Sequence, residues 1–116
     1  MKYDIKLKNE KDILILRESG KRLAAVLQAV AQEVKPGVTT GYLNDFVYKM
    51  ITDMGDTPSF LNYKPFGASY AYPGSICISV NDQVVHGIGG GRVLKEGDIV
   101  GLDGGVTRFG WDINYF

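Results

Sequence analysis

Residues 73–103, PGSICISVNDQVVHGIGGGRVLKEGDIVGLD, decide the fold of this chain. Short apolar runs alternate there with polar or glycine-rich breaks, a pattern that predicts successive β-strands at 76–80, 83–88 and 99–106. The stretch also contains the only histidine, His86, the only cysteine, Cys77, and an acidic residue in an apolar run, Asp103. An imidazole and a carboxylate delivered by neighbouring strands can anchor hydrolytic metal chemistry.

Two amphipathic helices are predicted before these strands. Apolar residues recur every three or four positions from Ile13 to Val34, which indicates a helix over residues 10–34 with Asn9 as its N-cap. A second helix starts at a cap formed by Thr39 or Thr40 and ends near Gly55. Helices first and an antiparallel meander afterwards predict an α+β fold in one domain over residues 1–116.

The composition limits the classes of function. The 13 basic and 13 acidic residues cancel, so the chain offers little electrostatic attraction to nucleic acid. A single cysteine forms no internal disulfide, which fits a reducing cytoplasm, and no apolar run near the N-terminus suits a signal peptide or a membrane span. We therefore expect a cytoplasmic protein that binds neither nucleic acid nor membranes.

Asp103 lies in the apolar run IVGLDGGV, where alternation places it on the same face as Ile99 and Gly101. A carboxylate in such a strand is bound to a metal, paired with a charge or hydrogen-bonded, because burying it alone is costly. Two interpretations stay open from the pattern: a metal ligand, or a carboxylate bound by backbone N–H groups.

His86 and Cys77 each allow a structural and a functional interpretation. A lone histidine on an apolar strand is more often structural, although the glycines that follow His86 permit a close backbone approach. Cys77 fits a small buried apolar residue better than a reactive thiol. The run Gly89–Arg92 lacks the Lys-Ser/Thr pair and the helix start of a phosphate loop.

Two further regions bear on the site. Residues 56–73 are rich in aromatic residues, including Tyr63 and Tyr72, and we expect this loop to line or cover a site. The C-terminal residues read as a hairpin whose last strand, 111–116, carries Asp112 and Asn114 two positions apart and therefore on one face. Such oxygen donors, across a hairpin from Asp103, can share a metal.

Three blocks together resemble the type I methionine aminopeptidases: VKPGVTT at 34–40, PGSICISVNDQVVHGI at 73–88 and RVLKEGDIVGLD at 92–103. These metallohydrolases have the pita-bread fold and remove the initiator methionine from new proteins. The resemblance implies that the chain matches the N-terminal half of a pita-bread fold, with two helices packed on an antiparallel sheet.

The resemblance also implies roles for residues. Asp103 matches the first metal-ligating aspartate, and the second falls on Asn114, with Asp112 as a substitute after a register shift. His86 matches a catalytic histidine that contacts substrate, and Tyr63, Tyr72 and Cys77 match positions that line the methionine pocket. The implied cofactor is a divalent metal: cobalt, manganese, iron or zinc.

The family takes its other ligands, a histidine and two glutamates, from a second half with no counterpart in these 116 residues. We therefore expect a methionine aminopeptidase-like half-domain that forms a homodimer through its exposed sheet face, binds peptide N-termini and is catalytically incomplete alone. One alternative is an active aminopeptidase completed by a second half or chain. Another is a non-catalytic module that binds N-terminal peptides.

Overall fold

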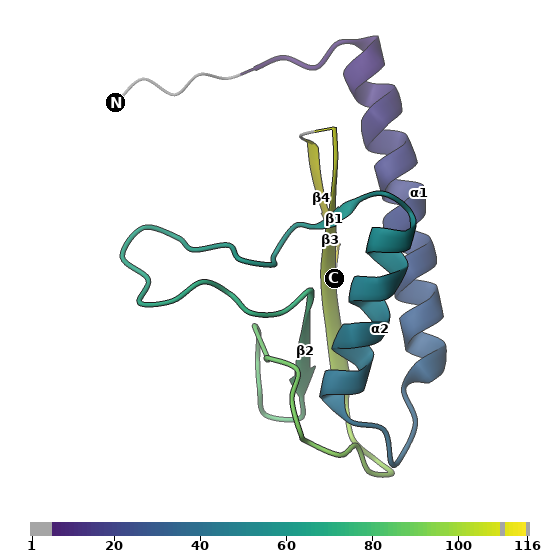
Figure 1. Ribbon diagram of the computed structural model, residues 1–116. Helices are drawn as coiled ribbons and strands as arrows, with labels where there is room; N and C mark the ends of the chain where they lie inside the picture. The colour runs from purple at the N-terminus through teal and green to yellow at the C-terminus, as the bar shows by residue number, and fades with distance from the viewer. Residues whose placement is uncertain (1–5, 110, 116) are drawn as a thin grey trace.

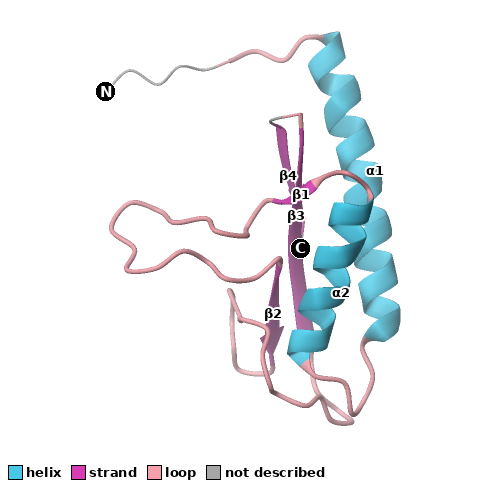
Figure 2. Ribbon diagram, viewed as in Figure 1, coloured by secondary structure: helices cyan, strands magenta, loops and turns pink. Residues whose placement is uncertain are grey.

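The computed structural model describes residues 6–109 and, for residues 111–115, the backbone. Helix α1 (Glu10–Glu33) and helix α2 (Thr40–Asp53) pack side by side against one face of a sheet (Figures 1 and 2). The strands of the sheet are β1 (Thr57–Pro58), β2 (Ile76–Val80), β3 (Val100–Arg108) and β4 (Trp111–Tyr115). The predicted α+β class, with two helices on an antiparallel sheet, is confirmed.

The helix boundaries agree with the sequence signals. The Asn9 side chain accepts from the Asp12 N–H at 2.9 Å, and the Asp12 carboxylate accepts from the Asn9 N–H at 3.0 Å. This reciprocal pair satisfies two N–H groups at the start of α1. The Thr39 hydroxyl caps α2 by accepting from the Tyr42 N–H at 3.1 Å. Neither helix, nor any other in the described residues, is long and apolar enough to cross a membrane.

Strand β3 is the centre of the sheet and pairs antiparallel with the other three strands. Its first half pairs with β2, which places Cys77 opposite Asp103, and its second half pairs with β1 and β4. The helices bury a continuous apolar core against this sheet, so they leave its opposite face for other contacts. The largest core residues are Leu23, Val26, Val30, Leu43, Val47, Ile51, Ile76, Ile78, Val80 and Val106.

Residues 60–75, called the aromatic loop from here on, leave the sheet and return to it at adjacent positions of β3. The Ser59 N–H donates to the Gly105 carbonyl at 3.1 Å, and Ile76 pairs with Gly104. Two bonds close the base of the loop: the Asn62 N–H donates to Tyr72 and the Tyr72 N–H to Tyr63, at 2.8 and 2.7 Å. The loop projects from the side of the sheet opposite the helices (Figure 1).

The strand predicted over residues 83–88 is wrong. This segment runs beside β2 with two backbone bonds to it, from the Ile78 N–H to the Gly87 carbonyl at 2.9 Å and, across the turn, from the Gln83 N–H to the Val80 carbonyl at 3.2 Å. Two backbone N–H groups that a β-ladder would use bond to side chains instead. The Gln83 side chain accepts from the Val80 N–H, and the Ser79 hydroxyl accepts from the Gly87 N–H. Local side-chain bonds of this kind compete with a ladder.

The glycine run after this segment contacts the start of α2. The Gly41 N–H donates to the Gly90 carbonyl at 2.8 Å, and the Thr40 N–H donates to the Arg92 carbonyl at 3.0 Å. The Gly90 N–H in turn donates to the Thr40 hydroxyl at 2.9 Å. The first N–H groups of α2 are therefore used by the chain itself.

A buried carboxylate joins the helices to the sheet. Asp56, whose side chain is 0% exposed, lies 3.4 Å from the Arg22 guanidinium of α1 and 2.9 Å from the Arg108 guanidinium of β3. Arg22 also donates to the Met54 carbonyl at the end of α2 at 2.8 Å. Since each carboxylate oxygen has its own cation, the burial of this charge is compensated.

We predict that Asp56→Asn lowers the free energy of unfolding by about 3 kcal/mol, because two arginines lose their shared counterion in a largely dry site. Urea denaturation followed by circular dichroism measures the change. The control is Asp53→Asn, which removes an exposed pair with Lys49 and is expected to cost less than about 0.5 kcal/mol. Equal losses in the two variants would contradict a special role for Asp56.

A methyl group at position 87 has no room. A Cβ on Gly87 would collide with the Ile78 carbonyl oxygen, whereas a Cβ on Gly90 would meet nothing within 4 Å. We therefore expect Gly87→Ala to destabilise the fold by about 3 kcal/mol through overpacking, and Gly90→Ala to leave the thermal midpoint nearly unchanged. Similar thermal midpoints for the two variants would contradict this prediction, because segment 83–88 would then be able to shift and accommodate a methyl group.

Candidate functional site

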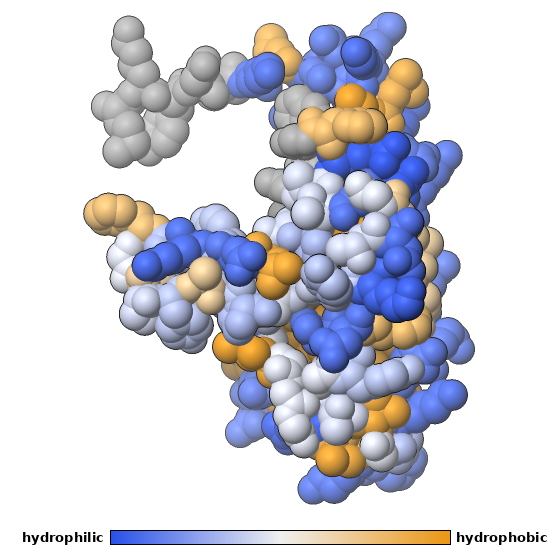
Figure 3. All heavy atoms as spheres, viewed as in Figure 1, coloured by the Kyte–Doolittle hydropathy of each residue, from blue (hydrophilic) through white to orange (hydrophobic). Residues whose placement is uncertain are grey.

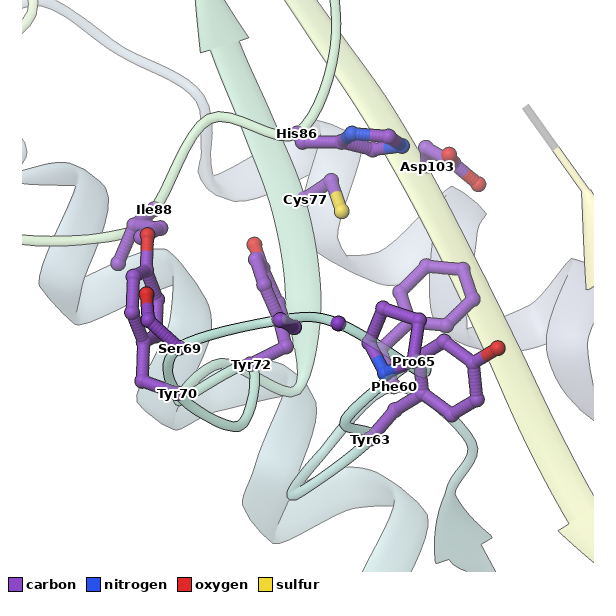
Figure 4. Close-up of a pocket in the computed structure, with 12 residues that line it drawn as sticks. Phe60, Tyr63, Pro65, Ser69, Tyr70, Tyr72, Cys77, His86, Ile88 and Asp103 are labelled. Carbon is purple, nitrogen blue, oxygen red and sulfur yellow. The ribbon is translucent and has the colours of Figure 1, made fainter.

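An open cavity of about 610 Å³ lies between the aromatic loop and the face of the sheet opposite the helices (Figure 4). Most of its lining is aromatic or apolar, and its ionisable groups Asp103 and His86 lie together at one end (Figure 4). The lining residues are Phe60, Tyr63, Pro65, Gly67, Ala68, Ser69, Tyr70, Tyr72, Cys77, His86, Ile88 and Asp103. Five of the residues predicted for the site therefore line one cavity.

Asp103 comes from the middle of β3, directly opposite Cys77. Partial burial raises the pKa of the Asp103 carboxyl, and the nearby His86 opposes that rise. Among the described residues, no hydrogen bond to this carboxylate is found, so the interpretation as a carboxylate bound by backbone N–H groups receives no support. The carboxylate faces the cavity with its acceptor positions available (Figure 4).

His86 adopts a left-handed backbone conformation, with φ of 59°. Its side chain is exposed, and the ring lies above Cys77 and beside Asp103 (Figure 4). Each of the three residues comes from a different segment: the loop after β2, β2 itself and β3. Tertiary structure thus brings the histidine and the aspartate together, although their segments do not pair as strands.

Tyr72 and Cys77 form the wall of the cavity nearest the sheet. The Tyr72 hydroxyl lies 3.1 Å from the Ile76 carbonyl oxygen and 2.9 Å from that of Gly87, and its ring meets Phe60 edge to face with centroids 6.5 Å apart. Burial raises the pKa of both the Tyr72 hydroxyl and the Cys77 thiol. Both groups are therefore neutral near pH 7 and present a polarizable, uncharged surface.

The aromatic loop forms the mouth of the cavity. Tyr63 and Tyr70 are 62% and 65% exposed, and Phe66, near the turn of the loop, is fully exposed. Figure 3 shows the loop standing away from the body of the molecule, with an apolar side chain at its end. Sequence reasoning identified the loop by its aromatic content but missed Ile88, because that residue was placed in a strand.

The side chains of Asn114 and Asp112 lie outside the described residues. The backbone register of β3 and β4 pairs Asn114 with Gly105 and Asp112 with Thr107. Of these two positions, Asn114 therefore pairs closer to Asp103 along β3. The metal-ligand role of either residue stays a prediction.

The described residues by themselves do not fit a catalytic metal centre. They contain no group of three or more His, Cys, Asp or Glu side chains arranged to bind a metal ion. Asp103 offers one carboxylate, whereas catalytic sites for zinc and similar ions use at least three protein ligands. A metal at Asp103 would need donors from elsewhere.

Comparison with known proteins gives a consistent result. The model of metallopeptidase family M24 matches residues 15–113. Methionine aminopeptidase of Clostridium perfringens is 44% identical over 105 residues, which are 90% of this chain and 40% of that protein. The enzyme of Aquifex aeolicus is 41% identical over 92% of this chain and 42% of its own length. The chain thus spans about two fifths of these relatives.

Solved structures agree with the sequence comparison. The crystal structure of methionine aminopeptidase from Rickettsia prowazekii superimposes with a TM-score of 0.87 and 41% identity, over 96% of this chain and 42% of that one. An Xaa-Pro dipeptidase from Bacillus anthracis, 21% identical, has a TM-score of 0.66 over 92% of this chain and 28% of its own and shares the fold. The chain therefore belongs to metallopeptidase family M24, the pita-bread family that its sequence blocks predicted.

Proposed function

We propose that this chain carries part of a methionine aminopeptidase site, which binds the N-terminal residue of a peptide and is catalytically incomplete on its own. One observation carries the proposal: a largely aromatic cavity ends at His86 and Asp103, while the described residues supply too few metal ligands for hydrolysis. Membership of the family indicates the class of reaction, and the lining of the cavity indicates the kind of residue that we propose it binds.

The cavity chemistry suits a methionine side chain and a free amino terminus. Neutral Tyr72, the Phe60 ring and the Cys77 thiol form a polarizable apolar wall, which favours contact with a thioether. Asp103 lies at the polar end of the same cavity, where its negative charge attracts a peptide ammonium group. His86 lies beside it, within reach of the first peptide bond, and is the proposed catalytic contact.

Hydrolysis requires donors that come from a second surface. The proposed set on this chain is Asp103, with Asn114 or Asp112, and the proposed ion is cobalt, manganese, iron or zinc. When bound, such an ion would polarise the scissile carbonyl and activate water. A reducing cytoplasm suits the site, because the unpaired thiol of Cys77 faces the cavity.

We propose a second copy of the chain as the source of that surface. The face of β3 opposite the helices carries small and polar residues, Gly101, Asp103 and Thr107, so we expect the exposed rings of the aromatic loop to supply much of the apolar contact area. Exposed apolar side chains gathered on one loop favour association, and a two-fold axis would place two copies of Asp103 across one interface.

We expect the protein to sediment as a dimer at micromolar concentration, and Tyr70→Ser to shift it toward monomer by removing an exposed ring from the aromatic loop. Analytical ultracentrifugation over a concentration series measures both. Tyr48→Ser is the matched control, because Tyr48 is exposed on α2, outside the cavity. A wild-type protein that stays monomeric throughout would reject self-association.

A complete enzyme formed with another chain is the second candidate, favoured by the open cavity beside Asp103. We expect no release of methionine from Met-Ala by the chain alone with added cobalt or manganese, and weak metal binding by calorimetry. Asn114→Asp adds a carboxylate and should tighten metal binding about tenfold, a gain of about 1.4 kcal/mol.

Two further variants make the metal measurement specific. Asp103→Asn should abolish metal binding, while Asp82→Asn, which changes an exposed carboxylate outside the cavity, should leave it unaltered. Metal binding that persists in Asp103→Asn would contradict the proposed ligand. Methionine release by the wild-type chain alone would show that the site is complete without a partner.

A further inference from the structure

The conformation of His86 requires an explanation, because its side chain does not supply one. A residue with a Cβ in the left-handed region is strained relative to ordinary backbone, and such strain persists where the surroundings impose it. The His86 side chain is exposed, and its ring lies at the edge of the cavity beside Asp103 (Figure 4). On the C-terminal side of His86, hydrogen bonds hold the backbone.

Gly87, the next residue, is buried and bonded on both sides. Its N–H donates to the Ser79 hydroxyl at 3.0 Å, in a buried position. Its carbonyl accepts from the Ile78 N–H at 2.9 Å and from the Tyr72 hydroxyl at 2.9 Å. A Cβ would collide with Ile78, so the glycine also lies closer to β2 than any other residue could.

These bonds determine the two peptide planes that follow His86. The bond to Ser79 sets the plane between residues 86 and 87, whose orientation is the ψ angle of His86. The bonds from Ile78 and Tyr72 set the next plane. Rotation of the first plane would break a buried hydrogen bond, at a cost comparable to the backbone strain that it would relieve. Strand β2 therefore fixes the ψ side of His86, and the φ of 59° is the angle at which the preceding chain meets this fixed plane.

We propose that Ser79 and Tyr72 are positioning residues: through Gly87 they hold the peptide plane that follows His86 and so keep its imidazole beside Asp103 over the cavity. The catalytic meaning of this placement rests on the proposed function, whereas the placement itself does not. Ser79 contributes through its hydroxyl and does not line the cavity. Tyr72 has two roles, as a cavity wall and as a donor to Gly87.

The single histidine makes the inference directly measurable by NMR on the full chain labelled with ¹³C and ¹⁵N. In the wild type, the coupling between the amide proton and Hα of His86 and its ¹³Cα shift should lie in the left-handed range, with contacts between the imidazole and Cys77 protons. Ser79→Ala should move both backbone values toward ordinary backbone and remove the imidazole contacts. Tyr72→Phe should produce a smaller change of the same direction.

Two controls separate positioning from general stability. Ser79→Thr retains an acceptor oxygen and should restore the wild-type His86 signals. Ser19→Ala removes another buried hydroxyl, which donates to the Ile15 carbonyl inside α1, and should leave the His86 signals unchanged. Wild-type His86 signals in a folded Ser79→Ala protein, together with unchanged signals in Tyr72→Phe, would overturn the inference.

Binding of the dipeptide Met-Ala tests the functional part separately. If His86 contacts the substrate, its displacement in Ser79→Ala should weaken binding or slow turnover of any complete assembly by up to about 100-fold, the cost of a misplaced group. A displaced His86 with unaltered Met-Ala binding would support the positioning role and contradict the proposed function.

Discussion

The structure depends on the burial of β2 along its whole length. All five residues of this strand are buried, with the helices on one face and the cavity wall on the other. One side of the strand pairs with β3, and the other is covered by the segment that contains His86 and Gly87. Because β2 fixes both neighbours, the spacing between His86 and Asp103 follows from the position of a single strand.

The two faces of the sheet are used unequally. Both helices cover one face and bury the apolar core there, and the Asp56 carboxylate ties α1 and the end of α2 to β3 through two arginines. The other face carries the cavity, its polar groups and the exposed aromatic loop. The buried core is therefore concentrated on one side of the sheet, and the open cavity, where we propose recognition, lies on the other.

Much of the fold was predictable because the signals were local. The capping box at Asn9, the cap at Thr39 and the apolar stripes place both helices within one or two residues of their observed ends. The alternation around Asp103 groups that residue with Gly101, and the structure places this face opposite the helices. The strand prediction for 83–88 failed because Ser79 and Gln83 use their side chains to occupy backbone groups of that segment and of β2, which no local pattern of apolar residues reveals.

The sequence by itself determined the family, the α+β class and five of the residues that line the cavity, since these depend on residue type and on spacing along the chain. Only the tertiary structure decided how His86 meets Asp103: by a left-handed backbone at residue 86 and a buried glycine at 87, not by strand pairing. The physical reason is that a side-chain hydroxyl from β2 and a tyrosine from the aromatic loop converge on Gly87 from positions 8 and 15 residues away. Such convergence is a property of the packed chain.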